Sequence, residues 1–201
     1  MEDCPNEAHN FVATILPFQT NDYKSCCVSL RLKNHYAPEE IKNLQKVGYH
    51  IPTQNPIYYL YNWKRSQFTV YNCFELADIK HRSIFRSELD FLIACSWNKD
   101  VYYFMDIIES ITRDIHCYVI YSNTSQFGCS RVLQPKKHEL RNIAQIGGGK
   151  NCTLLVAELD IKSLATFQTH GYDSEDDSFK PLPPGFDREN VIRRHKHQFN
   201  L

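Results

Sequence analysis

The sequence has no long uninterrupted apolar run and no excess of charge of either sign. Among its 201 residues, 23 are Lys or Arg and 23 are Asp or Glu, so the formal net charge is zero. A transmembrane helix needs about 20 consecutive apolar residues, and proteins that bind nucleic acid or anionic membranes usually carry a basic surface. We therefore expect no membrane-spanning segment and no global electrostatic attraction to nucleic acid.

The sequence shows no metal-binding spacing and no phosphate loop, and we expect no leader peptide. The nine histidines form no metal pattern, and we interpret His195 and His197 as part of a solvated basic end rather than as a ligand pair. Gly147–Lys150 lacks the spacing and the following helix of a phosphate loop, which favours a turn. The eight cysteines lie in apolar segments with no leader before them, as expected for reduced thiols in a cytoplasmic protein. No metal and no cofactor is expected.

What the sequence does contain is an alternation of strand and helix patterns. β-rich apolar runs bounded by turn residues predict strands, and apolar residues at three- and four-residue steps predict helices. The predicted strands are residues 11–18, 26–32, 58–61, 68–72, 89–95, 117–121 and 152–160, and the predicted helices are residues 38–47 and 101–111. Polar turns at residues 20–22 and 63–66 indicate two hairpins. The order strand, helix, strand over residues 89–121 implies a right-handed parallel crossover, so the fold class is α/β.

The periodic patterns stop shortly after Leu164. Gly171–Asp177 is acidic, Lys180–Gly185 is rich in proline, and the last residues are basic. Such composition is typical of an extended arm. We therefore expect one domain over residues 1–168 and a tail or docking arm over residues 169–201.

The segment Tyr71–Glu75 is the strongest candidate for chemistry. It closes an apolar strand pattern with Cys73, and the carboxylate of Glu75 follows two residues later. A thiol at the end of a strand is well placed to act as a nucleophile. The alternative interpretation is structural, because a free cysteine is often a small buried hydrophobe.

The order of the downstream motifs carries a resemblance. Asp90–Asn98 is followed by a helical pattern, then by Ile115–Ser125 and by Phe127–Arg131. With Cys73, this order resembles the carbon–nitrogen hydrolase (nitrilase) superfamily. The resemblance implies an α-β-β-α sandwich and a cysteine nucleophile that cleaves a small amide or nitrile through a thioester. The segments Ser96–Asp100 and Arg113–Cys117 are similar to nitrilase domains linked to bacterial reverse transcriptases, which implies such an enzyme as a partner.

The same resemblance assigns the remaining catalytic roles. Lys33, which ends the predicted strand 26–32, matches the lysine that contacts the oxyanion, although a lysine in this place can also be a surface charge. Glu39 is the candidate for a second glutamate and Glu40 is nearly as good, while both also suit the first turn of a helix. Glu75 is expected to orient its loop through backbone hydrogen bonds.

Polar and aromatic residues after the cysteine strand match positions that shape the substrate pocket in this family. In other folds, Asn and Ser at strand ends make local backbone bonds, and this interpretation stays open. The candidate substrate-binding residues are Trp97, Asn98, Asn123, Ser125, Ser130 and Arg131.

One element of the family pattern is not found. The superfamily begins with a strand, a helix and a strand that carries the general-base glutamate, whereas only Glu2 and Glu7 precede Phe11 here. We therefore expect a sandwich that lacks its first strand-helix-strand. Either a second copy or a partner chain covers that edge, or the protein is a catalytically inactive binding or interaction module.

Overall fold

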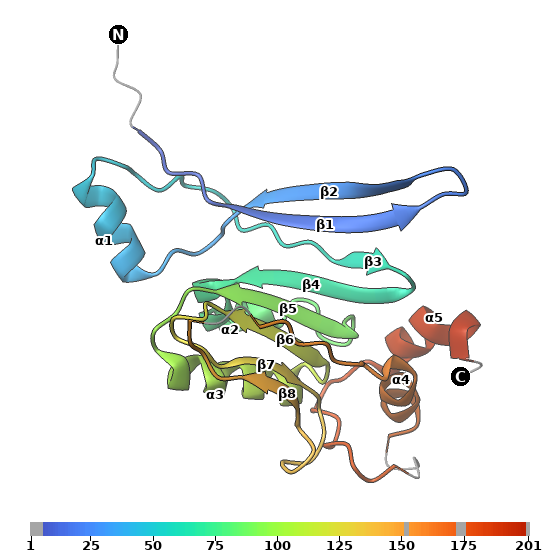
Figure 1. The fold of residues 1–201 in the computed structure, drawn as a ribbon. Coiled ribbons are helices and arrows are strands. Elements are labelled where there is room, and N and C mark those ends of the chain that lie inside the picture. Colours follow the sequence, from blue (N-terminus) through green and yellow to red (C-terminus); the bar gives the residue numbers. More distant parts are fainter. Residues whose placement is uncertain (1–5, 151–152, 172–175, 200–201) are drawn as a thin grey trace. The chain divides into compact units, whose positions relative to one another are not determined.

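The computed structural model describes residues 6–150, 153–171 and 176–199. Its contacts divide the chain into two compact units, residues 1–59 and residues 60–201 (Figure 1). The boundary between the units lies between residues 59 and 60. Each unit is described by itself below.

The first unit is built on one antiparallel hairpin. β1 (Phe11–Gln19) pairs with β2 (Lys24–Leu32) along its whole length, as the sequence predicted. The hydroxyl of Thr20 accepts a hydrogen bond from the amide of Tyr23 at 3.2 Å and so closes the turn. α1 (Pro38–Lys46) follows, and its proline stands at the start, where a missing amide hydrogen is harmless.

The second unit contains a six-stranded sheet in the order β3-β4-β5-β6-β7-β8. β4, β5 and β6 run parallel, and the other neighbouring strands are antiparallel. The predicted hairpin is present, but its first strand is Tyr61–Trp63 and residues 58–60, which the prediction included, form no strand. Lys64 and Arg65 both take the left-handed backbone that its two-residue turn requires. The strands are β3 (Tyr61–Trp63), β4 (Ser66–Asn72), β5 (Phe91–Ser96), β6 (Tyr118–Asn123), β7 (Ser130–Leu133) and β8 (Asn142–Ile146).

Helices cover the two faces of this sheet differently. α3 (Val101–Asp114) makes the predicted parallel connection and lies on one face of the sheet (Figure 1). It buries its apolar stripe there, and the Phe104 ring lies 6.2 Å from the Tyr121 ring. α4 (Ile161–His170) packs on Tyr118, which faces the opposite side because side chains alternate along a strand. The short elements η1 (Cys73–Ala77) and α2 (Ile79–Arg82) follow β4.

The strand predicted at residues 152–160 is wrong for the described part of that range. Residues 153–160 form no strand, and the side chains of Leu154 and Val156 are 88% and 85% exposed. The sheet instead ends with β8, whose polar Asn142 and Gln145 weakened the sequence pattern. An apolar run becomes a strand only when a neighbouring edge pairs with it.

The interpretation of His195 as a solvated residue is also wrong. It lies in α5 (Arg188–Phe199), its side chain is 1% exposed, and its Nε2 is 2.8 Å from Oδ1 of Asp90. Nη1 of Arg194 contacts the same oxygen at 2.7 Å. Burial opposes ionisation of Asp90, but the hydrogen bond of His195 and the charge of Arg194 outweigh it, so the pKa of Asp90 lies below its usual range.

None of the described helices is long and apolar enough to cross a membrane.

Candidate active site at the carboxyl edge of the parallel strands

The three parallel strands of the second unit end side by side. One row of the sheet contains Asn72, Cys95 and Ser122. The loops that follow β4, β5 and β6 therefore begin at the same edge of the sheet. Ligands of open α/β sheets bind at this carboxyl edge. Most of the residues that the sequence singled out lie here.

Cys73 is the first residue after β4 and is half-buried. Its backbone is left-handed, with φ at +48°, which is uncommon for a residue with a side chain and produces a sharp turn. The carboxylate of the fully buried Glu75 accepts a hydrogen bond from the amide of Asn72 at 2.7 Å. The expectation that Glu75 orients this loop through the backbone is therefore confirmed. A strained turn between a strand and a helix is also how other hydrolases present a nucleophile.

Asn123 ties together the loops that follow β5 and β6. Its Oδ1 accepts a hydrogen bond from the amide of Asn98 at 3.0 Å, and its Nδ2 donates to the carbonyls of Asn98 at 2.9 Å and Gly128 at 3.0 Å. All three contacts are with the backbone. Asn123 is buried and holds the shape of the edge.

Ser130 and Ser125 continue this backbone network. Oγ of Ser130 accepts from the amide of Asn123 at 3.0 Å and donates to its carbonyl at 3.1 Å. The carbonyl of Ser125 accepts from the amide of Gly149 at 2.9 Å. Gly128 must be glycine, since its φ is +74° and a Cβ there would overlap the carbonyl of Gly147. The glycine run after β8 therefore packs on the loop after β6.

Arg131 and Trp97 differ in what they contact. The guanidinium of Arg131, on β7, lies 3.5 Å from the carboxylate of Glu109 on α3. Trp97 follows β5 and is 72% exposed, and its ring centroid lies 6.2 Å from that of Phe127 in the loop after β6. Two loops thus place an aromatic pair at the edge that carries Cys73. The sequence argument missed Phe127 as a site residue.

Lys33 belongs to the first unit. Its side chain is 6% exposed, its Nζ lies 2.6 Å from Oε2 of Glu40, and the same ammonium stands over the Tyr36 ring at 5.0 Å. The other oxygen of Glu40 accepts a hydrogen bond from Nδ2 of Asn10 at 2.9 Å. Glu39 is exposed on α1. Of the two glutamates that the sequence left open, Glu40 is the one that binds the lysine.

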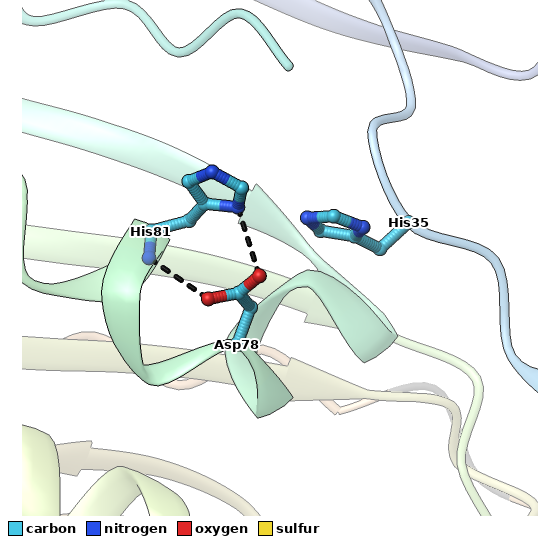
Figure 2. Close-up of side chains that lie close together, drawn as sticks. All are labelled: His35, Asp78 and His81. Carbon is cyan, nitrogen blue, oxygen red and sulfur yellow. Dashed lines mark hydrogen bonds and ion pairs between the residues drawn. The ribbon is translucent and has the colours of Figure 1, made fainter. Parts of the chain in front are cut away.

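Asp78 and His81 form a carboxylate–imidazole pair at the start of α2, shortly after Cys73. Asp78 caps α2, because its Oδ1 accepts the His81 amide at 3.0 Å while its Oδ2 lies 3.0 Å from Nδ1 of the same residue (Figure 2). Both carboxylate oxygens of Asp78 therefore contact His81 within the single turn of α2. His35, also drawn in Figure 2, belongs to the first unit.

The fold has clear counterparts among solved structures. No protein-family model and no curated protein matches the sequence. XC1258 from Xanthomonas campestris, a CN-hydrolase superfamily protein with an arsenic adduct in its active site, matches with a TM-score of 0.54 at 10% identity, over 85% of this chain and 71% of its own. Nit3 from Saccharomyces cerevisiae, a member of branch 10 of the nitrilase superfamily, matches with a TM-score of 0.55 at 16% identity, over 82% of this chain and 65% of its own.

The fold is nitrilase-like. A mutant of the Nesterenkonia AN1 amidase from the same superfamily agrees, with a TM-score of 0.50 at 13% identity, over 78% of this chain and 64% of its own. The chain thus spans slightly less than two thirds of Nit3 and of the amidase. Similarity at such identities establishes a fold and not an activity.

Proposed function

We propose that the protein is a carbon–nitrogen hydrolase that uses Cys73 as its nucleophile. The observation that carries the proposal is the placement of this thiol: half-buried, on a left-handed turn, at the carboxyl edge of parallel strands in a nitrilase-like fold. A packing cysteine needs neither that backbone nor that edge. Small amides or nitriles are the proposed substrates.

The proposed reaction for an amide has two halves. The Cys73 thiolate forms a bond to the carbonyl carbon, the carbonyl electrons move to oxygen, and the C–N bond breaks as the amine leaves with a proton. A thioester remains on Cys73. Water then attacks that thioester, which releases a carboxylic acid and restores the thiol.

Lys33 is proposed to stabilise the oxyanion, and Glu40 to hold the lysine. A buried ammonium needs a carboxylate partner, and Glu40 supplies one at 2.6 Å. This assignment gives Glu40 the role that the sequence first gave to Glu39. The carboxylate that activates water is proposed to come from a second copy of this chain or from a partner chain.

The aromatic pair of Trp97 and Phe127 is proposed as one wall of the substrate site. Asn98, Asn123, Ser125 and Ser130 support that wall through the backbone contacts described above. Arg131, on β7, is proposed to support it as well, and its guanidinium pairs with Glu109 on α3.

The experiment compares two thiols at the same edge. Cys129 also has a left-handed backbone, with φ at +61°, and is half-buried, which makes Cys129→Ala the matched control for Cys73→Ala. Ammonia release from propionamide and the mass of the acylated protein are measured with the full chain. We expect Cys73→Ala to abolish both signals and Cys129→Ala to keep at least half of each. Ammonia release that survives in Cys73→Ala would refute the proposal.

A second candidate function is an interaction module without turnover. The observation in its favour is the exposed apolar face of the β1–β2 hairpin, formed by Phe11, Ile15, Val28 and Leu30. In that case Cys73 reacts with electrophiles but no ammonia is released, and the partner is the reverse transcriptase that the sequence resemblance implied. Co-expression with such an enzyme and co-purification through a tag on either chain tests this alternative.

A further inference from the structure

Two buried hydroxyl groups near Cys73 have no hydrogen-bond partner in the described part of the chain apart from each other. They are Oη of Tyr121 and Oγ of Ser96. The Tyr121 side chain is 2% exposed, so water does not replace the missing partner from bulk solvent. Buried polar groups in folded proteins are nearly always satisfied, and each exception needs a reason.

The sheet register places both groups at the edge that carries the candidate nucleophile. Tyr121 shares a row with Tyr71 and Ala94, one residue before the end of β4, and its ring faces α3. Ser96 ends β5 in the row that follows Asn72. Ala94, between the two tyrosines, has only a methyl group.

The pKa of Tyr121 depends on the Cys73 thiol. Burial raises the pKa of Tyr121 to about 12, a hydrogen bond with the Ser96 hydroxyl opposes that rise, and the thiols of Cys73 and Cys129 add to it. Tyr121 therefore keeps its proton at neutral pH and can act only as a neutral donor or acceptor. Glu109 of α3 pairs with Arg131 of β7 at 3.5 Å and with Arg141 at 2.8 Å.

Packing alone does not account for a tyrosine at this position. Phenylalanine would fill the same space against Phe104 without burying a hydroxyl whose only partner is the Ser96 hydroxyl. Burying a polar group that is incompletely paired lowers stability.

We propose that Tyr121 is a positioning residue for the thiol chemistry, and that its hydroxyl donates a hydrogen bond to Cys73 when the thiol loses its proton. Ser96 donates in turn to the oxygen of Tyr121, which strengthens the donor. This inference rests on the proposed role of Cys73 as the nucleophile. The Tyr121 hydroxyl, whose only partner in the resting protein is Ser96, gains a second partner in the reactive state.

The test follows alkylation of Cys73 by chloroacetamide, site by site, with mass spectrometry of the full chain between pH 6 and pH 10. In this reaction the thiolate sulfur bonds to carbon and chloride leaves. Loss of a hydrogen bond to a charged group corresponds to about a tenfold change. We expect Tyr121→Phe to lower the rate at pH 7 about tenfold and to move the rate profile to higher pH, while thermal stability is unchanged or higher.

The control is a second buried tyrosine on the same strand. The hydroxyl of Tyr118 donates to the carbonyl of Asp160 at 3.1 Å, so Tyr118→Phe should lower stability and leave the Cys73 profile in place. Ser96→Ala should move the profile in the same direction as Tyr121→Phe, by a smaller amount, and it keeps the test valid if Tyr121→Phe folds poorly.

The outcomes separate the inference from the proposed function. An unchanged profile in both Tyr121→Phe and Ser96→Ala, with Cys73 reactive, overturns the inference alone. A Cys73 that is no more reactive than the exposed Cys26 overturns the proposed function and the inference with it.

Discussion

The left-handed backbone of Cys73 supports its assignment as the candidate nucleophile as much as its thiol does. A left-handed conformation at a residue with a side chain costs about 1–3 kcal/mol and persists only when the surroundings enforce it. Here the buried carboxylate of Glu75 bonds the amide of Asn72 and holds the turn. The residue that was expected to orient the loop is thus the one that maintains the strain.

Lys33 provides the sharpest prediction for a single residue. Lys33→Met keeps the volume of a buried side chain but removes the ammonium that pairs with Glu40. If this group contacts the oxyanion, the amidase rate should fall at least ~100-fold, the scale of losing one oxyanion donor. Steady-state ammonia release measures the effect, and the exposed Lys42→Met on α1 is the control. Equal rates in the two variants would make Lys33 a structural cation.

Among the elements, the β1–β2 hairpin presents an unusual surface. Phe11, Ile15, Val28 and Leu30 lie on one face of this two-stranded ribbon, and all four are exposed. An apolar sheet face of this kind is typical of a surface that another layer covers.

This face predicts self-association of the isolated chain. Ile15 and Val28 are paired across the hairpin, so Ile15→Lys with Val28→Glu removes the apolar contact and adds an ion pair. We expect the wild type to form dimers or larger species at micromolar concentration and the double variant to be monomeric. Light scattering after size-exclusion chromatography measures the mass of each variant in solution, and Lys24→Glu, at an exposed position, is the control. A monomeric wild type contradicts the prediction.

At the scale of the whole molecule, acid stability depends on a buried histidine. Burial lowers the pKa of His116 to about 4, against an ordinary value of 6.5, although its hydrogen bonds to backbone carbonyls oppose the shift. Its ring lies among Phe167, Phe179 and Phe186, and its Nε2 donates to the carbonyl of Lys180 at 2.9 Å.

The sign of the pH effect follows from this shift. Above pH 6.5 the imidazole is neutral in both the folded and the unfolded chain, so its contribution is complete. As the pH falls from 6.5 to 4, the unfolded chain binds the proton first, and the fold loses up to about 3 kcal/mol. Urea unfolding at pH 7, 5.5 and 4.5 should show a smaller decline in His116→Gln than in the wild type. The exposed His170→Gln should decline like the wild type.

The sequence alone was sufficient to predict the elements that are specified by residues close together in the chain. The β1–β2 hairpin, α3, the parallel strands around it and the position of Cys73 after β4 were all predicted, because turn residues and apolar periodicity specify them within a few residues.

Only the tertiary structure decided the features that depend on residues far apart in the chain. Residues 153–160 carry a strand pattern but no pairing, whereas the more polar β8 finds an edge beside β7. His195 is buried because Asp90, more than a hundred residues earlier, supplies a carboxylate. The hydroxyl of Tyr121 stands near Cys73 only because β4 and β6 flank β5 in one sheet. Burial and pairing are properties of the assembled fold, and no local pattern encodes which distant partner will provide them.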